Sequence, residues 1–416
     1  MGTITGNQAI GIKEFGELST LRSLAVNGGT AYLPAKPYED PGVCVEAADE
    51  VAEVVRSGRT CYWGGGPKAK ELERQFAAAI GRRHAFFHSS GSSALITAIF
   101  ATGAGEGHSV VIGSSGFVAA INAVYHNRAR PIFLRTDPDT LLCTADGYER
   151  STEQQPTALL VTHFLGNVVD VPDIAAKVGA AYTIEDAGQA HGASFGGRPA
   201  GGWSDIGSFA GSHKKLVTAG QGGLNVCDSE LLLNRMRMVG HHGKAVRQVG
   251  EVPGYNFRGG EMESVLALHA LRGLEERART RNATAAAIQK ILDAAGIQTV
   301  QPGRGSHEVN PAWFDVGFIL PPEWEPYRDW LVRALNAENI PVSTYPSLIE
   351  MPWVKPWMLS MGWWGDREEE LLAHERSLWG RAIVIGTQMS PEDGARCAEG
   401  IAGLLTGTFK SAGAVA

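Results

Sequence analysis

Short apolar runs alternate with segments of helical apolar spacing across the middle of the chain. Runs that predict β-strands lie at 84–88, 109–112, 131–134, 158–164, 181–186 and 224–228. The segments 92–101 and 117–126, which separate the first three runs, have the spacing typical of helices. Because strands that alternate with helices form sheets covered on both faces, the pattern predicts a mostly parallel sheet and an α/β fold.

Glycine and proline mark helix ends in the stretch before this alternation. Apolar positions at helical spacing precede Gly58, which is well placed to end a helix. A second helix is expected between Pro67 and Gly81, because proline is favoured at the start of a helix and glycine just after its end. Residues 1–22 show little pattern and are expected to form a loose arm.

The hydrophobic pattern changes near residue 260. A long helix is expected to continue past Leu274, and the chain is expected to close with a helix around Ile401. A chain of 416 residues is also long for one domain. We therefore expect two domains, the first (1–260) with the N-terminal arm and a large domain, and the second (261–416) a small α+β C-terminal domain.

Charge and cysteine content exclude several classes of function. The net charge of −7 comes without a basic stripe, so no nucleic-acid partner is expected. The five cysteines include no Cys-x-x-Cys pair, which argues against zinc and iron–sulfur sites and favours reduced thiols in the cytoplasm. No apolar run reaches membrane-spanning length and the N-terminus lacks a signal-peptide pattern, so no membrane association is expected.

The residues best suited to chemistry lie in the segment 184–226. Asp186 ends an apolar run, and open α/β sheets build their sites at the carboxyl ends of strands. Lys214 and Lys215 follow in a loop rich in serine and glycine. A lysine amine can form a Schiff base and a fixed carboxylate can keep a heterocyclic nitrogen protonated, and pyridoxal 5'-phosphate (PLP) chemistry needs both. The alternatives are a surface charge or helix cap at Asp186 and a solvated lysine pair.

Two further segments suit a PLP site but also have structural explanations. Residues 89–93 (Ser-Ser-Gly-Ser-Ser) lie between a predicted strand and a predicted helix, where backbone N–H groups bind phosphate and serine is also favoured as an N-cap. Phe117 opens a predicted helix, either as a core residue or as a ring that stacks on a planar cofactor. The chain has no P-loop and no dinucleotide-binding glycine pattern in a suitable context, which disfavours nucleoside triphosphates and NAD.

The order of these segments resembles the motif series of a known family. The motifs are SGRTCYWGGGPKAKELERQFA, HSSGSSAL, TDPDT, EDAGQAHGASFGG, SDIGSF, KLVTAGQGG and GYNFRGGEMESVLALHAL. They are similar, in sequence and in order, to those of the DegT/DnrJ/EryC1/StrS aminotransferases, over residues 24–405. The resemblance implies a fold-type I PLP-dependent transferase, in which a mostly parallel large-domain sheet is followed by a smaller α+β C-terminal domain.

The resemblance implies catalytic roles for one lysine and one carboxylate. Lys215, five residues before Gly220, matches the lysine that bonds PLP, whereas Lys214 does not. Asp186 matches the carboxylate that binds the pyridine nitrogen. Once the amino donor has displaced it, Lys215 is expected to move the proton as general base and acid.

The resemblance also implies a set of cofactor-binding residues. Gly91 and Ser92 match the phosphate loop, and Phe117 matches the aromatic residue that stacks on the PLP ring. Gln189 matches the residue that contacts the ring hydroxyl. Asn256 matches an asparagine that reaches the phosphate in a partner subunit, which implies a homodimer with shared active sites.

Several positions depart from the family pattern. Ala210 stands where a phosphate-binding serine is usual, and Ser212 is the candidate to replace that serine. Ser89 and Gln221 stand where asparagine and glutamate are usual, so the substrate pocket cannot simply be borrowed from the family. Lys215 is retained, which argues against the relatives that carry histidine there and act as dehydratases.

The resemblance implies transfer of an amino group from L-glutamate or L-glutamine to a keto-sugar or keto-cyclitol, in secondary-metabolite or cell-surface sugar biosynthesis. Tyr345 lies where the family places residues on the substrate side. Two alternatives stay open. One is a PLP-dependent dehydratase or aromatising relative such as aminohydroxybenzoate synthase, and the other is a PLP-fold protein that binds a ligand without turnover.

Overall fold

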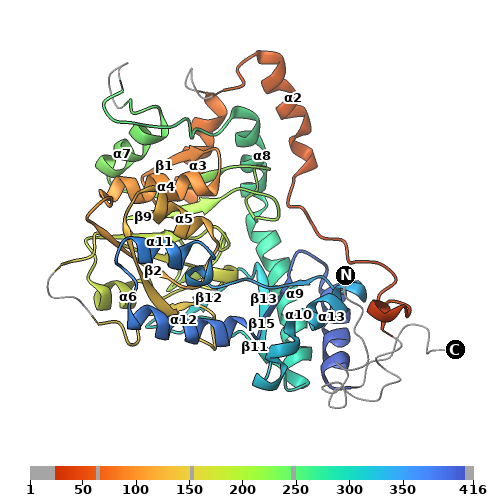
Figure 1. Ribbon diagram of the computed structural model, residues 1–416. Helices are drawn as coiled ribbons and strands as arrows, with labels where there is room; N and C mark the ends of the chain where they lie inside the picture. The colour runs from red at the N-terminus through yellow and green to blue at the C-terminus, as the bar shows by residue number, and fades with distance from the viewer. Residues whose placement is uncertain (1–23, 62–65, 150–153, 245–249, 408–416) are drawn as a thin grey trace.

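The chain forms a large eight-stranded sheet with helices on its faces and a smaller four-stranded sheet beside it (Figure 1). The computed structural model describes residues 24–61, 66–149, 154–244 and 250–407. The expected N-terminal arm, residues 1–22, lies outside the described residues.

The large sheet has the strand order β1-β10-β9-β6-β5-β2-β3-β4. Its strands are β1 (His84–His88), β2 (Ser109–Gly113), β3 (Arg130–Thr136), β4 (Cys143–Thr144), β5 (Ala158–Thr162), β6 (Tyr182–Asp186), β9 (Ile206–Ala210) and β10 (Gly223–Cys227). β9, β6, β5, β2 and β3 pair in parallel, and β1 runs in their direction because β10 pairs antiparallel with both β9 and β1. The predicted α/β class and mostly parallel sheet are therefore confirmed.

The helices around this sheet begin and end at residues that the sequence marks. They are α2 (Ala48–Ser57), α3 (Pro67–Ile80), α4 (Gly91–Thr102), α5 (Ala119–His126), α6 (Val171–Val178) and α7 (Glu230–Gly240). α2 and α3 end before Gly58 and Gly81, whose left-handed backbone closes each helix as predicted. α4 begins with a capping box, in which the side chains of Ser90 and Ser93 each accept a hydrogen bond from the other's backbone N–H.

The helical stretch after residue 260 is divided by Gly273 into α8 (Glu261–Arg272) and α9 (Leu274–Ala294). The prediction of one continuous helix past Leu274 is therefore wrong. α8 packs against α3, whereas α9 packs against α13 (Pro391–Leu405). The two helices therefore contact different parts of the chain. Glycine is a poor helix former, and Gly273, with φ −95° and ψ 10°, interrupts the helix there.

The second sheet has the strand order β11-β13-β15-β14, and all of its pairs are antiparallel. Its strands are β11 (Gln298–Thr299), β13 (Asp315–Ile319), β14 (Val342–Ser343) and β15 (Ala382–Gly386). The remaining elements are α10 (Arg328–Ala337), α11 (Val354–Ser360), α12 (Asp366–Trp379) and a small three-stranded sheet of β7 (Ser194–Phe195), β8 (Arg198–Pro199) and β12 (Val309–Asn310). The domain boundary near residue 260 stays a prediction.

Apolar side chains are buried on both faces of the large sheet. Along β5, Leu159 and Val161 belong to one buried cluster and Leu160 to another, because successive residues of a strand point to opposite faces. The first cluster continues to Phe318 of β13, so one core joins the two sheets. The edge formed by the carboxyl ends of the parallel strands is left open for a site.

Candidate active site

One cavity at the carboxyl edge of the large sheet gathers most of the predicted site residues. This main cavity has a volume of about 390 Å³ and is lined by seven of the eight predicted residues. These seven are Gly91, Ser92, Phe117, Asp186, Gln189, Ser212 and Lys215. β1, β5, β6 and β9 run in one direction and end at this edge, where open α/β sheets build their sites.

The structure separates the two lysines of the loop between β9 and β10. Lys214 has a left-handed backbone (φ 67°), and its Nζ lies 2.5 Å from Glu39 Oε2. Lys215 lines the main cavity, where its Nζ lies 4.1 Å from the centre of the Phe314 ring. Burial lowers the pKa of Lys215 to about 8, although the nearby Asp186 opposes the shift. The amine therefore loses its proton more readily than a solvated lysine does.

Asp186 ends β6 with its side chain in the main cavity. Its Oδ1 accepts a hydrogen bond of 3.0 Å from the Gly188 N–H. Burial raises the pKa of Asp186, while the Gly188 hydrogen bond and the charge of Lys215 act in the other direction. A cationic nitrogen beside this carboxylate would favour its ionised form.

Glu185 precedes Asp186 and lies on the opposite face of the sheet, where it is fully buried. Its Oε1 accepts hydrogen bonds from His163 Nε2 at 2.9 Å and from the Gly201 N–H at 2.8 Å. Its Oε2 accepts one from the Ser204 N–H at 2.7 Å. Glu185 is thus a structural residue that fixes the end of β6 and, with it, the backbone of Asp186.

A chain of hydrogen bonds orients the amide of Gln189. Its Oε1 accepts a hydrogen bond of 2.7 Å from the Leu165 N–H, which leaves the NH₂ group for other partners. The Tyr345 hydroxyl donates to Asp315 Oδ2 at 3.0 Å, and its oxygen also interacts with the Gln189 side chain. Burial raises the pKa of Tyr345, so the hydroxyl keeps its proton. Gln189 therefore presents N–H donors, which suit a hydroxyl oxygen on a ligand ring.

The start of α4, where the phosphate cradle is expected, lies at the main cavity. Gly91 and Ser92 line the main cavity, and the first N–H groups of a helix have no acceptor within the helix. Ser90 is the N-cap, which is the structural role considered from the sequence, and the phosphate-binding role of Gly91 and Ser92 stays a prediction. A Cβ at Gly91 would lie 2.7 Å from Ala210 Cβ, which shows how closely β9 approaches the cradle. The use of Ser212 in place of a serine at 210 stays a prediction.

Phe117 and Asn256 lie in different places. Phe117 precedes α5, lines the main cavity and is 54% exposed, so it is not a core residue. Asn256 does not line the main cavity of its own chain; its Oδ1 accepts a hydrogen bond of 2.9 Å from Arg258 Nε. Its contribution to the site of a second copy stays a prediction.

Thr162, Ser208 and Phe314 also line the main cavity but are not among the predicted residues. The hydroxyls of Thr162 and Ser208 are buried without a hydrogen-bond partner among the described residues. Thr162 is the last residue of the apolar strand β5, and a polar residue in that position is the signal that could have identified it. Phe314 lies in an apolar stretch just before β13 and carries no such signal.

These residues fit PLP, which carries an aldehyde, a pyridine nitrogen, a ring hydroxyl and a phosphate. Lys215 offers an amine for the aldehyde and Asp186 a carboxylate for the nitrogen. The Gln189 amide suits the hydroxyl, and the start of α4 suits the phosphate. The unpaired hydroxyls of Thr162 and Ser208 are further groups that a polar ligand would satisfy.

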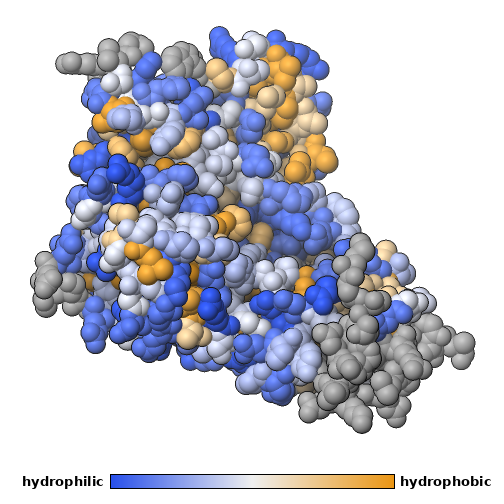
Figure 2. Space-filling view, in the orientation of Figure 1, coloured by the Kyte–Doolittle hydropathy of each residue, from blue (hydrophilic) through white to orange (hydrophobic). Residues whose placement is uncertain are grey.

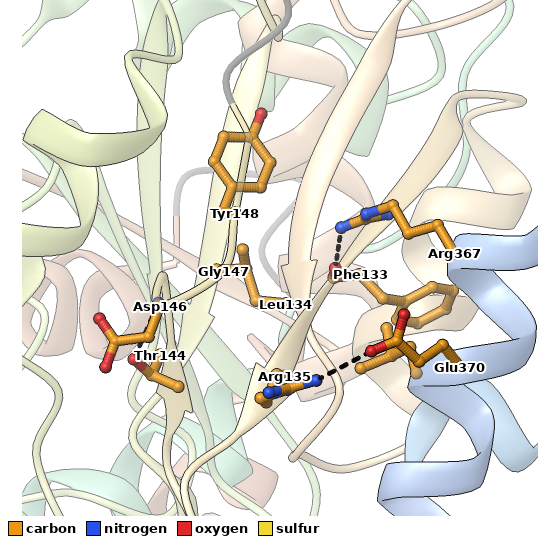
Figure 3. A pocket seen from close by; sticks show the side chains of 10 residues that line it. Phe133, Leu134, Arg135, Thr144, Asp146, Gly147, Tyr148, Arg367 and Glu370 are labelled. Atoms are coloured by element: carbon orange, nitrogen blue, oxygen red, sulfur yellow. Dashed lines mark hydrogen bonds and ion pairs between the residues drawn. The ribbon is translucent and has the colours of Figure 1, made fainter.

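A smaller cavity of about 100 Å³ lies between β3, the residues after β4 and α12. Figure 3 shows Arg135 directed toward Glu370, at 3.9 Å, and Arg367 bonded to the backbone oxygen of Phe133, at 2.8 Å. Its arginines are therefore already paired with groups of the protein. None of the predicted residues lines this cavity, so the main cavity is the candidate active site.

An open α/β sheet with a buried lysine and a carboxylate in one cavity is what fold-type I PLP-dependent enzymes require. The chain belongs to the DegT/DnrJ/EryC1/StrS aminotransferase family, whose model matches residues 44–355. It is therefore a PLP-dependent aminotransferase. The predicted family, cofactor and type of enzyme are confirmed.

Similar proteins include aminotransferases named for 2-deoxy-scyllo-inosose and a protein of spore coat polysaccharide biosynthesis. The chain is 31% identical, over 307 residues, to the L-glutamine:2-deoxy-scyllo-inosose aminotransferase of Micromonospora echinospora, a match that covers 68% of this chain and 72% of the relative. The enzyme of the same name from Streptomyces fradiae is 30% identical, with coverage of 68% and 71%. The spore coat polysaccharide biosynthesis protein SpsC of Bacillus subtilis is 28% identical, with coverage of 61% and 68%.

Solved structures share the fold. DesV of S. venezuelae is 26% identical with a TM-score of 0.73, and the match covers 85% of this chain and 92% of DesV. DesI, solved with its TDP-sugar product, is 23% identical with a TM-score of 0.78 and coverage of 93% and 97%. 3-Amino-5-hydroxybenzoic acid synthase has a TM-score of 0.76 at 20% identity, with coverage of 91% and 99%, which shows a common fold and does not favour the aromatising alternative.

Proposed function

We propose that this enzyme transfers an amino group from L-glutamine or L-glutamate to a keto-cyclitol or keto-sugar, in secondary-metabolite or cell-surface sugar biosynthesis. The observation that carries the proposal is that Lys215 and Asp186 line the same buried cavity. The names of the relatives that are 30% and 31% identical support glutamine as the donor and a cyclitol ketone as the acceptor.

Lys215 and Asp186 have different roles in the proposed reaction. PLP, when bound, supplies a ring that accepts the electrons of a carbanion at the donor α-carbon. Lys215 takes the proton from that carbon and later returns a proton, and its pKa of about 8 suits both directions near neutral pH. Asp186 binds the pyridine nitrogen and keeps it protonated. The Phe314 ring, 4.1 Å from the Lys215 amine, limits the water that reaches the amine.

The remaining predicted residues hold the cofactor in this proposal. Gly91 and Ser92 bind the phosphate with their backbone N–H groups, and Ser212 adds a hydroxyl. Gln189 donates to the ring hydroxyl, and Phe117 stacks on the ring. All five line the main cavity, which supports these assignments.

The proposal includes a homodimer in which Asn256 of each copy reaches the phosphate cradle of the other. Figure 2 shows apolar side chains gathered over α2, the helix that projects from the large-sheet part in Figure 1. Val43, Val45 and Val55, in and before α2, are 43%, 77% and 55% exposed. Apolar patches of this kind mark interaction surfaces, and a second copy of the chain fits this one.

A cytoplasmic location is also part of the proposal. All five cysteines are free thiols, as is usual in reducing compartments. In the part of the chain that the structure describes, the helices lack the length and apolar character that crossing a membrane requires.

A half-reaction assay tests the function. The PLP-loaded enzyme is mixed with L-glutamine or L-glutamate alone, and we expect the absorbance of bound PLP to be replaced by that of the pyridoxamine form. The aminated enzyme is then mixed with 2-deoxy-scyllo-inosose, other inososes and nucleotide-linked keto-sugars. We expect a keto-cyclitol to restore the PLP absorbance fastest.

Two outcomes of this assay would contradict the proposal. If no amino donor changes the absorbance of bound PLP, the chain is a ligand-binding protein of this fold. If the substrate loses water and no amino group appears in the product, the dehydratase alternative holds.

A further inference from the structure

A third cavity, of about 220 Å³, lies between α9 and the start of α13. The two helices pack side by side (Figure 1). Arg277 and Arg281, on α9, and Ser390, the N-cap of α13, line the cavity, which we call the arginine cavity. None of the residues assigned to PLP lines it.

Arg281 is a buried cation with an unused donor. It is 3% exposed, and its Nη2 donates to the Lys214 backbone oxygen at 2.7 Å. Its Nη1 is buried and has no hydrogen-bond partner among the described residues, and the same holds for Nε of Arg277. A buried N–H of a charged group is costly unless an acceptor satisfies it, so an acceptor bound beside these two N–H groups would be favourable.

The charged side chains that line the arginine cavity have a net charge of +1, which one negative charge on a ligand would neutralise. Its lining has two guanidinium groups and one carboxylate, Asp40, whose Oδ1 accepts a hydrogen bond of 2.8 Å from the Gly42 N–H. Burial lowers the pKa of Arg281 to about 10, and Asp40 and the buried Asp315 oppose that shift. Arg281 is therefore charged at neutral pH. The lining as a whole suits a ligand with one anionic group.

Several other polar side chains of the lining already have hydrogen-bond partners. Thr387 Oγ1 donates to the Trp313 backbone oxygen at 2.6 Å, and Gln388 Nε2 donates to the Phe314 backbone oxygen at 2.7 Å. Ser390 caps α13, whose N-terminus adds a positive potential at the cavity. Arg277 already donates from Nη2 to the backbone oxygens of Leu216 and Ala270 and from Nη1 to Cys44 Sγ. Arg281 Nη1 and Arg277 Nε are therefore the arginine N–H groups left for a ligand.

We propose that the arginine cavity binds the carboxylate group of a small organic acid through Arg281 and Arg277. Arg281 Nη1 and Arg277 Nε can each donate one charge-assisted hydrogen bond to a carboxylate, and burial strengthens such bonds. The cavity volume of about 220 Å³ suits a molecule of the size of an amino acid or a short dicarboxylic acid. The proposal does not depend on the identity of the donor or of the keto substrate.

The site is close to the catalytic lysine. Lys215 Nζ and Arg281 Cζ lie 4.1 Å and 5.7 Å from the centre of the same ring, that of Phe314. Burial and, more weakly, the charge of Arg281 lower the pKa of Lys215. A carboxylate bound to Arg281 would offset that charge. A ligand in the arginine cavity is therefore expected to raise the pKa of Lys215 in the main cavity.

Calorimetric titration of the PLP-loaded full chain with succinate tests the proposal, because succinate has no amino group to transfer. We expect Arg281→Gln to weaken succinate binding about tenfold or more, the effect of losing a charge-assisted hydrogen bond. Arg279→Gln is the matched control, since Arg279 is on the same helix, 72% exposed and paired with Glu276. This control should bind succinate as the wild type does, and inorganic phosphate should bind more weakly than succinate.

Crystals of the PLP-loaded enzyme soaked in succinate locate the ligand even if Arg281→Gln does not fold. A carboxylate on Arg281 Nη1 supports the proposal. Unchanged affinity in a folded Arg281→Gln variant, succinate found only in the main cavity, or only water on Nη1 would overturn it. Tighter binding of phosphate than of succinate would overturn the assignment to a carboxylate.

Discussion

Lys214 and Lys215 carry the same side chain in opposite surroundings. Lys214 is 31% exposed and paired with Glu39, whereas Lys215 lines the main cavity. We expect Lys215→Ala to slow the half-reaction with L-glutamine by about 10³-fold, the usual contribution of a positioned general base. Lys214→Gln should change the rate by no more than about threefold, the effect of a partly exposed ion pair. Stopped-flow absorbance measures both rates, and a Lys215→Ala enzyme at the wild-type rate would remove this lysine from the mechanism.

The burial of Lys215 also predicts how stability changes with pH. Its pKa falls from the ordinary 10.5 to about 8 in the folded enzyme without PLP. Between pH 8 and 10.5 this lysine binds more protons in the unfolded chain than in the folded enzyme, so the free energy of unfolding rises with pH. Below about pH 8 the lysine is protonated in both states, and the free energy of unfolding is lowered by the full cost of burying its charge. The full change is about 3 kcal/mol.

Urea unfolding of the PLP-free enzyme across that pH range measures this effect. Lys215→Met removes the titrating amine and should lack this part of the rise. The wild type is therefore expected to be less stable than the variant near pH 8, with a gap that closes toward pH 10.5. Stability curves that stay parallel for the two proteins would show that the amine is not buried as described.

Among the elements, α4 and β9 meet where we expect the phosphate of PLP to bind. Ala210, the last residue of β9, faces Gly91 at the start of α4. We expect Ser212→Ala to weaken PLP binding about tenfold, because one hydrogen bond to a charged group is lost. Adding Ala210→Ser to that variant should restore the affinity, because the new hydroxyl lies beside the start of α4.

Titration of the PLP-free enzyme with PLP, followed by absorbance, gives these dissociation constants. Gly91→Ala is the comparison that should lose PLP in either background, since its Cβ would lie 2.7 Å from Ala210 Cβ. An unchanged dissociation constant for Ser212→Ala would mean that the phosphate is held without this hydroxyl.

The pattern of apolar residues predicts strands that are apolar throughout, and it misses strands in which small residues allow close packing. β9 is absent from the predicted strands because Gly207 and Ser208 interrupt its apolar residues. A Cβ at Gly207 would lie 2.2 Å from the Gly201 backbone oxygen, so the small residue is needed for packing that the sequence pattern does not show. The break at Gly273 likewise depends on the packing partners of the two helices, since a single glycine does not end every helix.

The active site likewise has residues that the sequence pattern predicts and residues that it misses. Asp186 and Lys215 were predictable because one ends an apolar strand and the other lies in a distinctive motif. Phe314 was not, since its contact with Lys215 requires the second sheet to pack beside the first. Tyr345, which only the family resemblance indicated, reaches the main cavity from the same part of the chain. Contacts between distant segments are properties of the tertiary structure, which a local pattern does not contain.

At the scale of the whole molecule, the main cavity is built from both sheets. Asp186 and Lys215 come from the large sheet and its loop, whereas Phe314 and Tyr345 come from the segments before β13 and after β14. One buried cluster of apolar side chains joins the two sheets. The relative position of the sheets therefore sets the distance between Lys215 and the Phe314 ring, and with it the access of water to the amine.

The proposed homodimer makes a prediction that a monomeric enzyme cannot satisfy. If Lys215 and Asn256 of different copies serve one site, then Lys215→Ala and Asn256→Ala subunits complement each other in a mixed dimer. One site of that dimer has both native residues and the other has neither. Equal amounts of the two subunits, unfolded and refolded together, should recover about a quarter of the wild-type activity, because half of the dimers are mixed and each has one intact site.

Two controls decide how that experiment is interpreted. Each variant refolded alone should show only its own residual half-reaction with L-glutamine, and PLP binding by the Lys215→Ala subunit should persist, since the phosphate cradle remains. A mixture no more active than the sum of the separate variants would place Asn256 outside the partner's site. In that case Arg258, whose Nε donates to Asn256 Oδ1 at 2.9 Å, would indicate a structural role for the asparagine within its own subunit.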